Sequence, residues 1–135
     1  MAKRKRYLMV CVNRRSDDEP RGSCAARGAE ELYKELKNQL KSSGLAQLEA
    51  RPCSASCLDV CWAGPVVLVE PDHYFYGRVS VSDVPDIVRA LENDERVERL
   101  VLSQGDFLEP KELRALPVEE QERLKAVDPS DRRSI

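Results

Sequence analysis

The first part of the chain shows one apolar run followed by an amphipathic stretch. Tyr7 to Val12 is continuously apolar, which predicts a central strand covered on both faces. Residues 13–23 are polar and punctuated by proline and glycine, which predicts a long loop. From Cys24 to Lys41 the spacing predicts a helix, with Ser23 as its N-cap and Gly44 just beyond its end. The apolar positions of that helix share one face: Ala25, Ala29, Leu32, Leu36 and Leu40.

The second part of the chain reads as a hairpin and a helix after a short strand. Leu45 to Ala50 is predicted as a short strand that ends at Pro52. Val66 to Glu70 and His73 to Val79 are rich in β-branched and aromatic residues and flank a Pro-Asp turn, so they predict a hairpin. A second helix is expected from Ser82 or Asp83 to Glu92, with a proline in its first turn.

The order of these elements predicts the fold class. Strand, helix, strand, loop, strand, strand, helix is the order of an α/β protein with a thioredoxin-like mixed sheet, on which the helices pack. The first two strands should be parallel, because a helix connects them. Val97 to Leu102 fits either a helix or a strand. We expect one domain over residues 1–105, followed by a charged, proline-interrupted extension over 106–135 that forms short peripheral helices or a mobile tail.

Composition and charge narrow the class of protein. The 22 basic and 24 acidic residues give a formal charge of −2, which offers no electrostatic case for binding nucleic acid. No apolar run reaches the roughly 18 residues of a membrane span. The apolar stretch behind the basic start is shorter than the roughly 7–15 residues of a secretory signal. We therefore expect a cytoplasmic protein, in which clustered cysteines serve metal binding or catalysis rather than disulfides.

Five cysteines are the chemistry that this sequence offers. Buried cysteine is a common small apolar residue, but five cysteines in 135 residues are too many to be explained as core residues alone. A thioredoxin-type dithiol needs Cys-x-x-Cys, and the close cysteines here are separated by three residues, which disfavours a thiol oxidoreductase. Metal binding therefore accounts best for the cysteines.

The spacing of the cysteines distinguishes two kinds of metal site. Cys53, Cys57 and Cys61 have the close intervals of a zinc site, but twelve residues lie between Cys11 and Cys24. An iron–sulfur cluster takes ligands from separate loops, because each of its two irons is held by its own pair of thiolates. Spacing thus favours a Cys₄ [2Fe–2S] site modestly over zinc, and a zinc-stabilised interaction module is the alternative function.

Longer motifs carry a resemblance to a known family. CVNRRSDDEPRGSCAARG, CLDVCWAGPVVLVEPDHYFYGRV and VERLVLSQG together resemble the thioredoxin-like [2Fe–2S] ferredoxins of the Shethna type, over about residues 5 to 105. The resemblance implies that Cys11, Cys24, Cys57 and Cys61 hold one [2Fe–2S] cluster. It also implies a homodimer that carries single electrons between a reductase and an acceptor protein, rather than an enzyme.

The chain departs from the family pattern at two places. Phe75-Tyr76 stands where the family commonly has Trp-Tyr, and Cys53 is an additional thiol. We expect Cys53 to be a bystander at the end of a strand, since the family's Cys-x₃-Cys lies just before Gly-Pro. Trp62 either shields the cluster or offers a docking surface, or else it belongs to the core or to the dimer interface; His73 is expected to be a turn residue. Four arginines flank the first cysteine pair and are either tuning charges or solvated loop residues: Arg14, Arg15, Arg21 and Arg27.

Overall fold

A mixed four-stranded sheet forms the centre of the protein. The computed structural model describes residues 4–13, 23–24, 27–47 and 49–125. The strands, in the spatial order β2-β1-β3-β4, are β1 (Arg6–Cys11), β2 (Ala50–Ala55), β3 (Val67–Glu70) and β4 (Tyr74–Tyr76). β1 and β2 are parallel, whereas β3 is antiparallel to both β1 and β4, so the predicted mixed sheet, parallel first pair and hairpin are confirmed.

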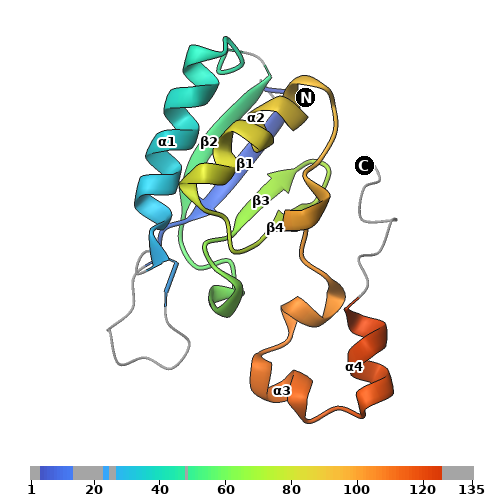
Figure 1. The fold of residues 1–135 in the computed structure, drawn as a ribbon. Coiled ribbons are helices and arrows are strands. Elements are labelled where there is room, and N and C mark those ends of the chain that lie inside the picture. Colours follow the sequence, from blue (N-terminus) through green and yellow to red (C-terminus); the bar gives the residue numbers. More distant parts are fainter. Residues whose placement is uncertain (1–3, 14–22, 25–26, 48, 126–135) are drawn as a thin grey trace.

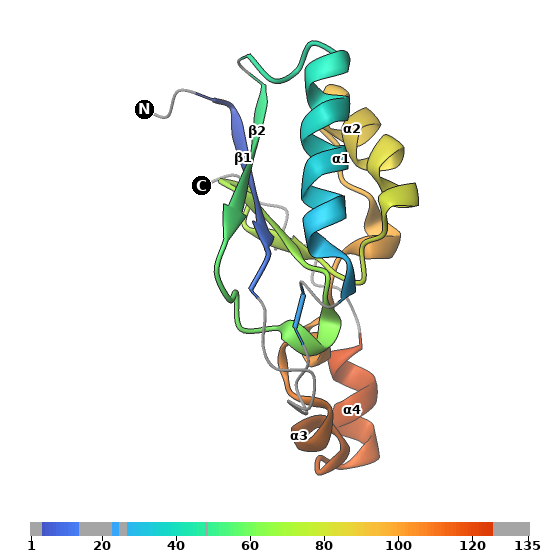
Figure 2. The ribbon, with the colours of Figure 1, turned by 90° about the vertical axis from the view of Figure 1, so that its left-hand side faces the viewer.

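Two helices cover one face of this sheet. α1 (Ala29–Ser42) and α2 (Val84–Glu92) lie side by side on it, as Figure 2 shows. The row of cross-strand neighbours under them is buried and largely apolar: Pro52, Leu8, Val69 and Tyr74. The predicted inward positions of α1 at Leu32, Leu36 and Leu40 are at most 1% exposed, so burial of apolar area holds α1 and the sheet together.

The opposite face of the sheet corrects one expectation. We expected the first strand to be covered on both faces, but among the described residues helices cover only the face of Leu8 and Val10. The other face carries a row of half-buried neighbours, one from each strand: Cys53, Met9, Leu68 and Phe75. An unbroken apolar run therefore did not distinguish a two-sided strand from a central strand with one open face.

α1 begins later than predicted. It starts at Ala29 rather than near Cys24, and its N-cap is Gly28 instead of Ser23. Gly28 has a φ of 92°, a left-handed conformation that glycine adopts without steric cost and that a helix cannot pass through. Instead, the Cys24 carbonyl accepts hydrogen bonds from the Arg27 N–H at 3.1 Å and from the Ala29 N–H at 3.0 Å, ahead of the helix.

β2 is displaced from the predicted strand. The expected strand over Leu45–Ala50 is wrong, because β2 runs from Ala50 to Ala55 with Pro52 inside it. Proline is tolerated there since β2 lies at the edge of the sheet and has a neighbour, β1, on one side only. The correction places Cys53 within the strand, beside Met9.

The remaining elements follow the sequence more closely. His73 lies in the turn between β3 and β4 with a φ of 62°, as expected of a turn residue. α2 is preceded by a 3-10 turn at Val81–Asp83, which Ser80 and Asp83 cap reciprocally. The ambiguous segment 97–102 contains a 3-10 turn (Glu98–Leu100) and a single bridge from Val101 to Tyr76, so it is neither a full helix nor a full strand.

The C-terminal extension forms short elements at one end of the molecule. A 3-10 turn (Gln104–Phe107) leads to α3 (Pro110–Arg114) and α4 (Val118–Leu124), which lie beyond the lower edge of the sheet in Figure 1. Residues 126–135 lie outside the described residues. Over the described part of the chain, none of the helices combines the length and apolarity that a membrane crossing requires.

Candidate metal centre

Two of the predicted ligands are buried together. Cys11 ends β1, and Cys24 begins the turn that leads into α1; both side chains are fully buried. They belong to one apolar cluster, which is separate from the main core and gathers at the end of the sheet where β1 ends. Its other buried members come from the start of α1, from the loop after β2, from the residue before β3 and from the segment that follows Val101: Ala29, Val60, Ala63, Val66 and Leu102.

The loop after β2, which carries the other predicted pair, packs against the same cluster. Val60 of this loop is a member of the cluster that contains Cys11 and Cys24, and Leu58 and Trp62 pack against it. Cys57 is half-buried in the loop, and its Sγ accepts a hydrogen bond of 3.2 Å from the Asp59 N–H. Cys61 opens a 3-10 turn (Cys61–Ala63) directly after Val60; its side chain lies outside the described part.

Backbone geometry supports the hydrogen bond at Cys57. Asp59, whose N–H donates to Cys57, has a φ of 69°, the left-handed conformation that asparagine and aspartate adopt more readily than most residues, so the loop bends sharply directly after the donor. Backbone N–H groups that point at sulfur stabilise thiolate charge and favour reduction of an iron–sulfur centre. The loop thus offers Cys57 the kind of donor that a metal-bound thiolate needs.

Cys53 occupies a different setting. It lies in β2, opposite Met9 on the open face of the sheet, and is half-buried. Three residues separate it from Cys57, and two of them, Ser54 and Ala55, are the last residues of β2. This position agrees with the expectation that Cys53 belongs to the strand, although it stands in the middle of the strand and not at its end.

The donor set fits an iron–sulfur cluster. Among the described side chains, no three His, Cys, Asp or Glu residues lie close enough together to hold a metal ion. The side chain of Cys61 is not among the described ones. What they do provide is a pair of fully buried thiols beside a loop that carries two more, with a 3.2 Å N–H···S hydrogen bond. An open hollow of about 390 Å³ adjoins them where β1 and β2 end, lined by Val12, Asn13, Ser54, Ala55 and Ser56.

The charges expected around the first cysteine pair are only partly visible. Arg14, Arg15 and Arg21 lie outside the described residues. Arg27 is exposed and donates a hydrogen bond of 3.2 Å from its Nη1 to the carbonyl oxygen of Ser23. The sequence predicted that the helix begins at Cys24. In the structure α1 begins at Ala29, so Cys24 does not lie at the helix N-terminus.

One contact beside the site was not expected from the sequence. The indole Nε1 of Trp62, the residue after Cys61, donates a hydrogen bond of 2.8 Å to the backbone carbonyl of Asp106. Trp62 is half-buried and packs against the cluster of Cys11 and Cys24, so it belongs to the core of this end of the molecule. A partner 44 positions away leaves no trace in local sequence patterns.

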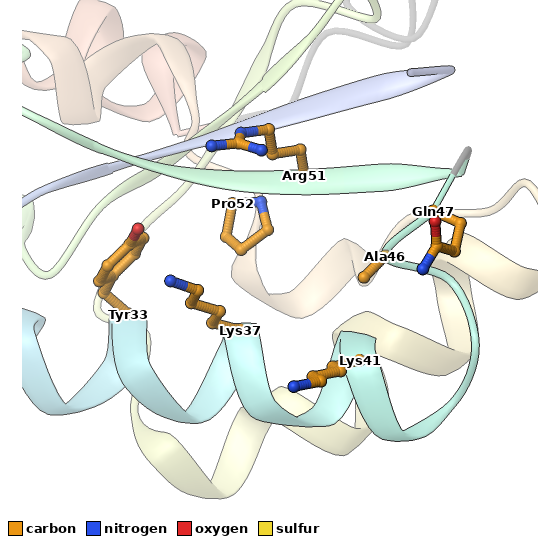
Figure 3. Close-up of a pocket in the computed structure, with 7 residues that line it drawn as sticks. All are labelled: Tyr33, Lys37, Lys41, Ala46, Gln47, Arg51 and Pro52. Atoms are coloured by element: carbon orange, nitrogen blue, oxygen red, sulfur yellow. The ribbon is translucent and has the colours of Figure 1, made fainter. Parts of the chain in front are cut away.

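A second groove lies away from the cysteines. It has a volume of about 270 Å³ and runs between α1 and β2, with Tyr33, Lys37 and Lys41 projecting from the helix (Figure 3). Its remaining lining comes from β2 and the preceding loop: Ala46, Gln47, Arg51 and Pro52. With three cationic side chains and no thiol, this groove is not part of the metal centre.

Comparison with known proteins identifies the family. No protein-family model matches the chain. Among curated proteins, the chain is 37% identical over 101 residues to the "Ferredoxin, 2Fe-2S" of Aquifex aeolicus (strain VF5), a match that covers 74% of this chain and 91% of that protein. The chain belongs to the family of [2Fe–2S] ferredoxins. A ferredoxin of the same description from Clostridium pasteurianum is 32% identical over 101 residues, covering 74% of this chain and 98% of that protein.

Solved structures identify the branch of the ferredoxins. The crystal structure of the thioredoxin-like [2Fe–2S] ferredoxin from Aquifex aeolicus superposes with a TM-score of 0.71 at 36% identity, over 74% of this chain and 98% of that chain. The thioredoxin-like fold expected from the order of elements and from the family motifs is therefore confirmed. Two variants of the same Aquifex protein, each with one cysteine replaced by serine, match with TM-scores of 0.70 and 0.69.

The spacing of those two variants leaves one choice open. The replaced cysteines are four positions apart in the Aquifex ferredoxin. In the chain described here, the same interval separates Cys57 from Cys61, and it also separates Cys53 from Cys57. The interval alone therefore does not show whether Cys53 and Cys57 or Cys57 and Cys61 are the second ligand pair. The burial of each thiol and its place in β2 or in the following loop are the remaining evidence.

Proposed function

We infer that this ferredoxin is a one-electron carrier that holds a single [2Fe–2S] cluster through Cys11, Cys24, Cys57 and Cys61. The observation that carries the proposal is the burial of Cys11 and Cys24 in one apolar cluster, against which the loop of the other two cysteines packs. The family membership supports the same function. The zinc-binding alternative loses its support, because the similar proteins are described as 2Fe-2S ferredoxins.

Each part of the site has a separate task in this proposal. Four cysteine thiolates hold the irons, and the bound cluster accepts and releases one electron at a time. The apolar side chains around Cys11 and Cys24 exclude water from the first pair. The Asp59 N–H donates to Cys57 and stabilises negative charge on its sulfur. Such an arrangement suits a carrier rather than an enzyme, with a reductase and an electron acceptor as its protein partners.

Metal analysis and spectroscopy test this function. We expect protein purified without oxygen to contain about two irons and two sulfides per chain, since each cluster has that composition. Dithionite should bleach the visible absorption and produce a paramagnetic state that accounts for one electron per chain. Stoichiometric zinc and no visible absorption, in protein from cells supplied with iron, would show instead that the thiols form a zinc site.

We further propose that the ferredoxin is a homodimer and works in the cytoplasm. The resemblance to the family supports the dimer, and the open face of the sheet offers a surface for it. The row Cys53, Met9, Leu68 and Phe75 is half-buried in the single chain and crosses all four strands, and its Phe75 end is already in contact with Phe107. A two-fold axis through such a row brings the same apolar side chains of two subunits together. The clustering of cysteines supports the cytoplasmic location.

Sedimentation tests the dimer and its surface together. We expect a mass near two chains at micromolar concentration, and a mass near one chain for Leu68→Asp, because a carboxylate in an apolar interface is costly. Val118→Asp is the control, since Val118 lies in α4 and is 72% exposed. A wild-type mass near one chain would contradict the dimer, and a dimeric Leu68→Asp would place the interface elsewhere.

A further inference from the structure

The C-terminal arm, defined here as residues 104–125, folds into one compact piece. Its first turn and its last helix meet at Gly105, which is buried. A Cβ at Gly105 would lie 3.2 Å from the Leu124 Cβ, 3.2 Å from the Leu124 carbonyl oxygen and 3.5 Å from a methyl group of Leu113. Glycine at this position therefore lets α4 close onto the turn that begins the arm.

Asp106 attaches this arm to the loop that carries the predicted ligands. Its backbone carbonyl accepts the 2.8 Å hydrogen bond from the indole of Trp62, which follows Cys61 directly. Its carboxylate accepts hydrogen bonds from the Ser103 N–H at 2.8 Å and the Ser103 hydroxyl at 2.9 Å. The same carboxylate pairs with Arg78 at 3.2 Å, and the Arg78 N–H in turn donates to the Ala63 carbonyl at 2.7 Å. Asp106 thus orients the carbonyl that Trp62 reaches.

A ring contact gives the arm a second attachment. Phe107 packs edge-on against Phe75 of β4, with ring centroids 5.3 Å apart. Both views of the fold place α3 and α4 beyond the turn formed by Cys61–Ala63, at the end of the molecule where β1 ends (Figures 1 and 2). The arm is therefore fixed against the sheet on one side and against the ligand loop on the other.

We propose that the C-terminal arm is a clamp on the ligand loop that slows release of the iron–sulfur cluster without supplying a ligand. The proposal rests on the function proposed above. A cluster leaves when its ligand loop moves away, and the Trp62–Asp106 hydrogen bond resists that movement next to Cys61. All five cysteines precede the arm, so the cluster forms without it and the arm acts on how long the cluster stays.

Two substitutions release the clamp from opposite sides. Trp62→Phe keeps an aromatic ring in the apolar cluster but removes the donor to Asp106. Gly105→Val leaves Trp62 intact and pushes α4 away from the first turn of the arm. Should Gly105→Val not fold, Gly105→Ala applies the same push with a smaller side chain. Both changes are made in the full chain.

The first measurement is the rate at which a chelator in excess removes iron from the oxidised protein, followed by the visible absorption. We expect Trp62→Phe to lose iron on the order of two- to tenfold faster than wild type, which is the factor that one hydrogen bond supplies. Gly105→Val should be at least as fast. Tyr33→Phe, which also removes a polar group from a half-buried ring, should release iron at the wild-type rate.

A second control separates clamping from a general loss of stability. Ile87→Val removes a methyl group from the buried face of α2, away from the arm, and lowers overall stability. Equal acceleration in Ile87→Val and Trp62→Phe would overturn the clamp, as would a wild-type rate in Trp62→Phe.

Amide hydrogen exchange tests the hydrogen bond between Trp62 and Asp106 independently of the iron–sulfur cluster. Backbone amides of residues 104–125 should exchange faster in Trp62→Phe than in Tyr33→Phe, and unchanged exchange would overturn the proposal. Wild-type protein that contained no iron and sulfide would instead refute the proposed function, and the exchange rates would still decide whether Trp62 holds the arm.

Discussion

Serine variants of the cysteines test the ligand assignment most directly. We expect Cys53→Ser to keep the wild-type absorption and about two irons per chain. Cys57→Ser and Cys61→Ser should lose the cluster or shift its spectrum, because a hydroxyl oxygen replaces a thiolate. The structural reason is that Cys53 lies inside β2, whereas Cys57 is in the loop that packs against the buried pair.

The degree of burial adds a magnitude to this prediction. Cys53 is half-buried on the open face, where water reaches a hydroxyl, so Cys53→Ser should change the free energy of unfolding of the iron-free protein by no more than about 0.5 kcal/mol. Cys11 is 0% exposed in an apolar cluster. A hydroxyl there should cost about 1–3 kcal/mol in the same iron-free protein.

Two measurements on each variant therefore check the reasoning separately. Iron and sulfide analysis with visible spectra reports which thiols are ligands, and urea unfolding of iron-free protein reports their burial. The pair would instead be Cys53 and Cys57 if Cys53→Ser abolished the cluster while Cys61→Ser kept it. Equal unfolding free energies for Cys11→Ser and Cys53→Ser would contradict the separate settings that we describe for the two thiols.

Three further predictions concern the parts of the fold that support the site. Gly77→Ala places a Cβ 2.1 Å from a methyl group of Leu102 and 3.2 Å from the Ala63 carbonyl, so it should lower the free energy of unfolding by about 1–3 kcal/mol in urea; an unchanged value would mean that the chain relaxes freely there. Leu36→Ala in α1 should cost about 2–5 kcal/mol, since Leu36 is fully buried, and a loss below about 1 kcal/mol would contradict its place in the core. Burial, and next the neighbouring Tyr76, raise the pKa of Tyr74 well above its ordinary value of 10.0. Because the folded pKa is the higher one, the stability linked to Tyr74 is complete below pH 10.0 and falls as the pH rises further, and urea unfolding at pH 9 and pH 11 should show a smaller fall for Tyr74→Phe than for wild type.

Much of the outline of this ferredoxin was predictable from the sequence. Local apolar patterns indicated β1, the hairpin of β3 and β4, the inward face of α1 and the course of α2, because a helix or strand repeats its buried positions at a fixed interval. The family was also predictable, since the intervals between cysteines and the flanking Gly-Pro are properties of the chain itself. Which two of Cys53, Cys57 and Cys61 are ligands does not follow from their spacing, because the same interval separates each from the next. The assignment to Cys57 and Cys61 is a prediction.

What the tertiary structure decided concerns contacts between distant segments. The position of β2 depends on its pairing with β1, and the start of α1 depends on the left-handed Gly28; the apolar pattern records neither. The open face of the sheet follows from both helices packing on the same side. The hydrogen bond from Trp62 to Asp106 joins residues 44 positions apart and uses a backbone carbonyl, which every residue type possesses. Such a contact has no signature in the amino-acid sequence, so only the folded chain places the C-terminal arm beside the loop that carries the cysteines.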